Sequence, residues 1–329
     1  MLGNATQADL AGGTGRTFRH HTAWCWNVAP VIERDGVIYD EVQLDGTYLA
    51  DGWCLLVAID GSSGNVIAIQ WTDTEKHASW KALLERIAPP RVVVIDGGQG
   101  LLSALKDCWP EARIQRCLVH VRRNVHRQTT QNPRTDAGKA LFRLASALTG
   151  IESQEQATTW LTTLNGWKAE YGHLLNAKTR ATDRGAIRPA GTSAAATWWW
   201  THARLRKGYG LLERLAKREH LFTFLEPELA QLGINRTTNK IEGGVNAPLK
   251  DLLRRHRGMP SSHQRRAADW WCYLHSPAPA PPSSLIRPKH WQPAEPVIVE
   301  QDEIPGDYGT ATTAEEGLWA RKGWAGRST

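Results

Sequence analysis

The sequence has no long apolar run and few cysteines. No stretch of its 329 residues approaches the roughly 20 apolar residues that cross a bilayer. The first residues also lack the charged start and apolar core of a secretory signal. The five cysteines are scattered and odd in number, which disfavours a disulfide framework and indicates a reducing compartment. We therefore expect a cytoplasmic protein with no membrane partner.

Basic residues outnumber acidic ones outside the C-terminal tail. The chain carries 40 Lys and Arg against 33 Asp and Glu, a net charge of +7. Five basic and seven acidic residues follow His275, so residues 1 to 276 carry +9. A basic body of this kind suits a polyanionic partner, nucleic acid first. The length allows one large domain or two modest ones, each with a substantial core.

The first half of the chain alternates between strand and helix patterns. In the first strand Val42 and Leu44 share one face, while Asp45 points to the other. Strands are expected over 41–49, 53–60, 65–71, 91–96 and 113–117, with helices over 75–88, capped by Thr74, and over 101–108. A meander followed by strand–helix units predicts an α/β fold with a mixed five-strand sheet flanked by helices.

Asp96 stands at the end of one of these strands. It follows four apolar residues and precedes Gly97 and Gly98. Such a run indicates a short strand buried on both faces, and ligands of open α/β sheets bind at the carboxyl ends of such strands. The alternative is that Asp96 caps the following helix through its side-chain oxygen.

The second half of the chain is predicted to be helical. The segment 135–233 shows helical periodicity throughout, and Trp198–Trp200 is expected in its longest helix. Those tryptophans either pack between helices or stack on exposed DNA bases. A later helix, capped by Thr238 and kinked at Pro248, carries Glu242 on a polar face.

Asp45, Asp96 and Glu242 form a carboxylate set on elements of one sheet. Carboxylates gathered in a small space repel one another, and their pKa values rise unless a cation neutralises them. Oxygen ligands suit Mg²⁺ or Mn²⁺. Two such ions about 4 Å apart can activate a nucleophile and stabilise a leaving oxygen.

The residues resemble those of Mutator-type DDE transposases, including bacterial insertion-sequence transposases. The resemblance rests on Asp45 in Leu-Asp-Gly-Thr-Tyr, Asp96 in Val-Ile-Asp-Gly-Gly-Gln-Gly, Cys117-x-x-His120 and Asn239-x-x-Glu242. It covers roughly residues 39 to 276 and implies a ribonuclease-H-like fold with an all-α insertion domain. The aspartates are 51 positions apart and Glu242 follows 146 positions after Asp96, which leaves room for that insertion.

The resemblance also implies a domain division and a role for each site residue. The expected parts are an N-terminal arm (1–38), the first part of the catalytic core (39–134), an all-helical insertion (135–233), the final acidic helix (234–276) and a Pro-rich, disordered tail (277–329). Asp45, Asp96 and Glu242 would hold two Mg²⁺ or Mn²⁺ ions, and His120 would be a fourth catalytic residue with Cys117 packed beneath it. The predicted DNA-binding residues are Arg122, Arg123, Asn239, Lys250, Arg254 and Arg255.

By the same resemblance the partner is double-stranded DNA. The substrates would be the transposon terminal inverted repeats and target DNA, and the protein would work as a homodimer or higher oligomer in the bacterial cytosol, associated with the nucleoid when bound to DNA. Family members commonly carry an N-terminal DNA-binding module, whereas about 38 residues precede the first strand here. The basic, aromatic stretch from Arg16 to Trp26 is therefore either the tail of such a module or a loosely packed arm.

Several alternatives stay open from the sequence. A zinc site could use Cys108, Cys117, His120 and His126, although their spacing is irregular. Asp60 also ends a strand and rivals Asp45, but capping of its hairpin turn is the commoner role. A catalytically silent DNA-binding remnant and a cellular ribonuclease-H-like nuclease are the competing functions.

Overall fold

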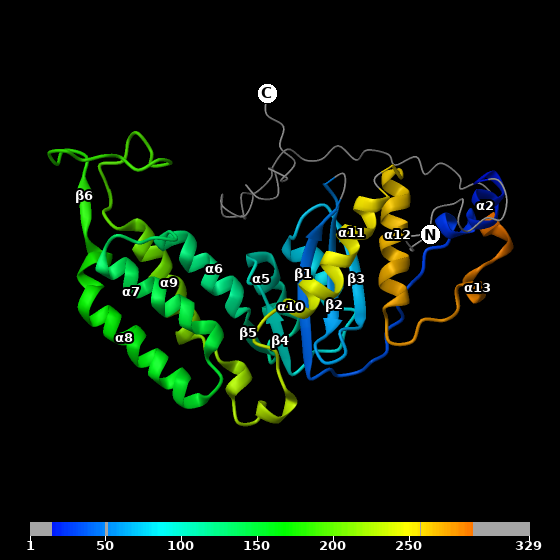
Figure 1. The fold of residues 1–329 in the computed structure, drawn as a ribbon, viewed down its shortest axis with the longest axis horizontal. Coiled ribbons are helices and arrows are strands. Elements are labelled where there is room, and N and C mark those ends of the chain that lie inside the picture. Colours follow the sequence, from blue (N-terminus) through cyan, green and yellow to red (C-terminus); the bar gives the residue numbers. More distant parts are fainter. Residues whose placement is uncertain (1–14, 50–51, 257, 292–329) are drawn as a thin grey trace.

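A five-stranded mixed sheet forms the centre of one half of the molecule (Figure 1). The computed structural model describes residues 15–49, 52–256 and 258–291. The strands are β1 (Glu41–Tyr48), β2 (Cys54–Asp60), β3 (Val66–Thr72), β4 (Val92–Ile95) and β5 (Arg113–Arg116), in the order β3-β2-β1-β4-β5. β1 pairs antiparallel with β2 and parallel with β4. The predicted mixed sheet is therefore confirmed, and its topology is that of a ribonuclease-H-like fold.

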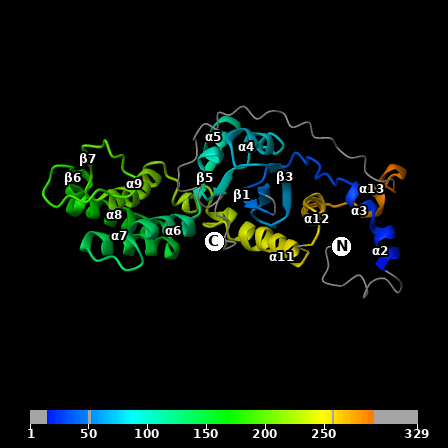
Figure 2. The same cartoon turned by 90° about the horizontal axis from the view of Figure 1, so that it is seen from above.

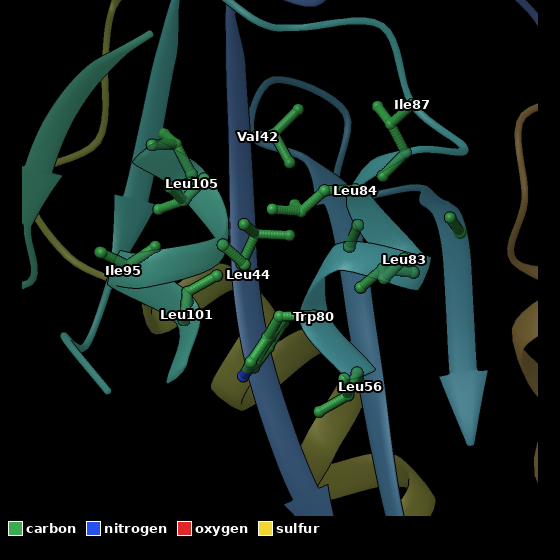
Figure 3. Packing of buried hydrophobic residues seen from close by; sticks show 14 of the residues in the cluster. Val42, Leu44, Leu56, Trp80, Leu83, Leu84, Ile87, Ile95, Leu101 and Leu105 are labelled. Carbon is green, nitrogen blue, oxygen red and sulfur yellow. The ribbon is translucent and has the colours of Figure 1, made fainter. Parts of the chain in front are cut away.

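One face of the sheet is covered by α4 (His77–Leu84) and α5 (Gln99–Cys108). Figure 3 shows Val42 and Leu44 of β1 beside Trp80 and Leu84 of α4, all fully or almost fully buried. This is the apolar face that the strand alternation predicts. The side chains of Gln43 and Asp45 consequently point to the opposite face.

The start of α4 differs from the sequence prediction. The helix begins at His77 rather than Glu75, and Lys76 occupies the N-cap position. Thr74 is instead held in the preceding turn, because the hydroxyl of Thr72 donates to the carbonyl of Thr74 at 2.9 Å. The prediction that Thr74 caps the helix is wrong for this reason.

The other face of the sheet is covered by a late helical segment (Figure 2). This segment comprises α10 (Asn239–Ile241), a π-helical turn (Glu242–Asn246), α11 (Ala247–Arg255) and α12 (Ser261–Leu274). Ile241, Val245 and Leu249 are buried against Leu55 and Val57 of β2. These three apolar residues form the surface through which the segment docks on the sheet.

A second hydrophobic core lies in the helical part of the chain that follows β5. Leu118, Val121 and Val125 of its first helix are fully buried. The elements are α6 (Leu118–Thr129), α7 (Asp136–Ala147), η2 (Leu148–Gly150), α8 (Gln154–Asn176), α9 (Ala203–Lys217), η3 (Thr223–Leu225) and η4 (Ala230–Leu232). No helix in the part of the chain that the structure describes combines the length and apolar character needed to span a membrane.

The predicted all-α insertion also contains a small sheet. β6 (Lys178–Arg180) pairs antiparallel with β7 (Trp198–Trp200). The prediction that Trp198–Trp200 lies in the longest helix is wrong, because that helix, α8, ends at Asn176. Aromatic residues favour strands as well as apolar helix faces, so the composition of this run decides neither.

The two ends of the described chain pack beside each other on α12. The N-terminal segment forms α2 (Gly15–Thr22) and α3 (Trp24–Asn27), and Trp270 donates from its indole to the carbonyl of Cys25 at 2.8 Å. A loosely packed arm is thus excluded for α3. The predicted disordered tail, where described, contains α13 (Pro282–Leu285) and η6 (Pro288–Trp291), and the carbonyl of His290 accepts from Asn27 at 2.8 Å. Residues 292–329 lie outside the described part.

Candidate active site

Asp45 and Asp96 lie on neighbouring parallel strands. Leu44 of β1 is in register with Ile95 of β4, so the two aspartates are the next residues along each strand. Both side chains are partly buried. The pairing thus brings together two of the three carboxylates that the sequence singles out, at the carboxyl edge of the parallel strands where ligands of such sheets bind.

The backbone after Asp96 depends on a close approach by Arg116. Gly97 has a φ of 103°, and a Cβ there would lie 1.7 Å from the guanidinium carbon of Arg116. Arg116 in turn donates to the carbonyl of Asp96. The carboxylate of Asp96 accepts from the N–H of Gly98 at 3.1 Å. This contact stabilises the turn but does not cap α5, whose N-cap residue is Gly98 and has no side-chain capping bond, and a carboxylate has further acceptor positions for another partner.

Glu242 enters the site from the π-helical turn between α10 and α11. Pro248 lacks a backbone N–H and its ring crowds the preceding turn, so a regular α-helix is disfavoured there. A wider turn directly before the proline accommodates it, and such turns are frequent at functional sites. Thr238 stands at the N-cap position as predicted, but its hydroxyl lies 2.6 Å from Glu242 Oε1 and makes no capping bond.

A buried carboxylate that sequence reasoning missed fixes this helix to β1. Glu41 is only 3% exposed and accepts from the backbone N–H of Asn235 at 2.6 Å and from its side-chain amide at 3.0 Å. Gln43 donates to Glu41 at 2.7 Å and accepts from the N–H of Ile241. The one sequence signal was an acidic residue at the start of the first expected strand. These bonds set the position from which Glu242 reaches the sheet.

The surroundings of Asp45 oppose the charged form of its carboxyl group. Burial, followed by the negative charges of Asp96 and Glu242, raises the pKa of Asp45 to about 7. The side-chain amide of Asn246 donates to its Oδ2 at 2.6 Å, and the N–H of Gly46 donates to Oδ1 at 3.0 Å. Two hydrogen bonds therefore hold the carboxylate in place, but they do not offset the desolvation and repulsion.

His120 joins the site from the first turn of α6. Its Nδ1 is buried without a hydrogen-bond partner and lies 3.7 Å from Glu242 Oε1. The adjacent Cys117 and the charges of Asp96 and Glu242 raise the pKa of His120, although burial acts against them. Burial alone would raise the pKa of the Cys117 thiol, but hydrogen bonding with His120 and Thr238 holds it below its ordinary value.

Cys117, His120 and Glu242 form a tight group, with ligand atoms within 4.8 Å of one another. The predicted zinc set of Cys108, Cys117, His120 and His126 is not assembled among the described residues. His126 instead stacks on Phe142, with ring centroids 3.9 Å apart, in the helical core. The zinc alternative is therefore wrong in its ligand set.

Asp60, the rival of Asp45, and half of the predicted DNA-binding residues have side-chain hydrogen-bond or ion-pair partners. Asp60 accepts from the N–H of Ser62 at 3.0 Å and of Ser63 at 2.9 Å, which is the predicted turn-capping role. Arg122 is half-buried and donates to Thr149, whereas Arg123, Asn239 and Lys250 are exposed. Arg254 and Arg255 each pair with Asp251 of the same helix.

The donor set fits a hard divalent cation. Asp45, Asp96 and Glu242 offer oxygen atoms, and the raised pKa of Asp45 reflects negative charge that a cation would relieve. The three carboxylates do not form so tight a group as Cys117, His120 and Glu242.

Part of the chain matches a known protein family. Residues 40–186 match the family described as "Transposase, Mutator family". This stretch, which contains β1, β4 and the two aspartates, is similar to the Mutator family of transposases. The chain is also similar to the "Transposase for insertion sequence element IS905" of Lactococcus lactis subsp. lactis (strain IL1403), with 27% identity over 168 residues, 45% of this chain and 41% of that protein.

The chain is similar to a second insertion-sequence transposase over part of its length. The "Transposase for insertion sequence element ISRM5" of Rhizobium meliloti (strain 1021) is 25% identical over 142 residues, 41% of this chain and 35% of the relative. The matched chain spans less than half the length of these curated relatives. The predicted resemblance is confirmed at the level of the family.

Proposed function

We propose that this chain catalyses metal-dependent phosphoryl transfer on DNA, cutting the ends of a mobile element and joining the new 3′-hydroxyl to target DNA. The observation that carries this proposal is the parallel register that places Asp45 and Asp96 side by side, at a site where burial and the charges of Asp96 and Glu242 raise the pKa of Asp45. Three carboxylates from separate elements stabilise the apo protein poorly, so their approach indicates a ligand of opposite charge. The names of the relatives support transposition as the process.

Each residue would have a distinct part in the reaction. Asp45, Asp96 and Glu242 would hold the ions, which when bound activate the attacking oxygen and stabilise the leaving one. His120 holds its buried Nδ1 3.7 Å from Glu242, where a protonated imidazole would orient that carboxylate. Asn246 orients the Asp45 carboxylate through its 2.6 Å hydrogen bond.

The test is cleavage of a labelled duplex that carries the sequences flanking the gene. Wild type and Asp96→Asn are compared in Mg²⁺, in Mn²⁺ and in EDTA, and the products are examined for both nicks and strand joining. We expect metal-dependent nicking and joined products from wild type, with a loss of at least 100-fold in Asp96→Asn. DNA binding without any nicking would favour a silent remnant, and nicks without joined products would favour a hydrolytic nuclease.

A further inference from the structure

The end of the helical part that lies away from the sheet carries an arm rich in tryptophan and positive charge. It comprises residues 178–206, that is β6, the loop 181–197, β7 and the first turn of α9, and is called the tryptophan arm here. Figures 1 and 2 both place β6 beyond the ends of α7 and α8. Asp183 is the single acidic residue of the arm. Its six basic residues are Lys178, Arg180, Arg184, Arg188, Arg204 and Arg206.

The tryptophans of β7 hold several of these cations in fixed positions. Lys178 Nζ lies 4.2 Å from the ring centre of Trp198 and 5.2 Å from that of Trp200. The guanidinium carbon of Arg206 lies 4.0 Å from the ring centre of Trp200. Trp198 is 41% exposed and meets Trp200 edge to face. The rings thus order cations that would otherwise be mobile at an exposed surface.

The charges of the arm are not neutralised by neighbouring carboxylates. Within the ranges 15–49, 52–256 and 258–291, none of the six cations forms an ion pair. Asp183 accepts from the backbone N–H of Arg180. Arg206 also donates to the carbonyl of Leu175 at 2.9 Å, but a guanidinium has five donors and retains others. The arm therefore presents an ordered group of positive charges to solvent.

A basic row on α6 connects this arm with the candidate active site. His120, Arg123 and Arg127 are three and four residues apart, so they share one face of the helix. Arg204 at the start of α9 donates to the carbonyl of Arg127, which joins the root of the arm to the end of this row. His120 and Arg127 are seven residues apart, roughly 10 Å along a helix, so the root of the arm lies about that far along α6 from His120.

We propose that the tryptophan arm binds the phosphate backbone of duplex DNA beside the cut site. This inference rests on the proposed function, since the partner is the DNA that the site would cleave. A separation of roughly 10 Å corresponds to about three base pairs at 3.4 Å each, so the contact lies about three or more base pairs from the scissile phosphate. Base stacking is the less suitable role, because Lys178 and Arg206 lie over the rings of Trp198 and Trp200.

The experiment measures binding of the full chain to a fluorescein-labelled 30-base-pair duplex and to the matching single strand over a range of salt concentrations. The variant is Lys178→Ala with Arg206→Ala; the matched control is Lys81→Ala with Lys106→Ala, two exposed cations on α4 and α5. Two lost phosphate contacts reduce the slope of log K against log salt by about 1.8, so the affinity for duplex should fall roughly 60-fold at 0.1 M salt. The control should bind duplex as wild type does.

Other outcomes would overturn the proposal in distinguishable ways. If the arm variant binds duplex as well as the control does while wild type still nicks DNA, the arm has no role in DNA binding but the proposed function stands. A Trp198→Ala variant that loses binding to the single strand and keeps full duplex affinity would show a base-stacking arm instead. Wild type that binds neither DNA at low salt would contradict both the arm and the proposed function.

Discussion

Replacing Asp45 with asparagine should stabilise the metal-free protein at neutral pH. The substitution keeps the size of the side chain and an oxygen that can accept from Asn246, but it removes a charge that burial and two other carboxylates oppose. A pKa of about 7 instead of 3.8 corresponds to at most about 4 kcal/mol at 1.36 kcal/mol per unit. Because Asp45 is only partly buried, solvent screening reduces this, and we expect about 2 kcal/mol.

The pH dependence of this effect has a definite sign. A carboxyl whose pKa is higher in the folded state favours folding while it is protonated, and this advantage is lost as the pH rises from 3.8 through about 7. The melting temperature of Asp45→Asn should therefore exceed that of wild type most at pH 8, by about 4–8 °C. The difference should shrink steadily as the pH falls to 5.

Thermal unfolding in EDTA and in Mn²⁺ measures both parts of this prediction. A ligand that binds the folded state raises the melting temperature, so Mn²⁺ should stabilise wild type strongly and Asp45→Asn weakly. Glu111→Gln, which removes an exposed carboxylate far from the site, serves as the control and should change neither value. If Asp45→Asn melts below wild type at pH 8 in EDTA, the account of the acidic site is incorrect.

Two further substitutions test the framework around the site. Gly97→Ala should lower the free energy of unfolding by more than about 2 kcal/mol, because φ is 103° and the new Cβ would meet Arg116. At Gly98 the nearest atom is 4.0 Å away, so alanine should be tolerated there. Equal free energies of unfolding for the two variants in urea would contradict this prediction. Glu41→Gln should cost about 1–3 kcal/mol, since the buried carboxylate accepts several hydrogen bonds, and a midpoint like that of Glu111→Gln would contradict that role.

The sequence pattern was sufficient for the elements that depend on local periodicity. The alternation of Val42 and Leu44 with Asp45 predicts which face of β1 each side chain occupies, because the period of a strand is two. The apolar run before Asp96 likewise predicts a buried strand with an aspartate at its end. These two local signals, together with the parallel pairing of β1 and β4, bring Asp45 and Asp96 to one edge of the sheet.

Features that depend on contacts far apart in sequence could not be predicted in this way. Glu41 is bound by Asn235, 194 positions later, and neither residue reveals the other. The need for glycine at position 97 follows from Arg116, which belongs to the next strand. The strand at Trp198–Trp200 is a third case, because its partner β6 lies across a 17-residue loop and the tryptophans suit either structure.

The central claim, that the acidic side chains hold the catalytic ions directly, is tested most directly by changing one ligand atom in the cleavage assay. Asp96→Cys replaces a carboxylate oxygen with sulfur, which Mg²⁺ accepts poorly and Mn²⁺ accepts better. The account predicts that this variant is inactive in Mg²⁺ and regains measurable nicking in Mn²⁺, while Asp96→Ala stays inactive in both. Equal nicking by Asp96→Cys and wild type in Mg²⁺ would contradict a role for Asp96 as a metal ligand.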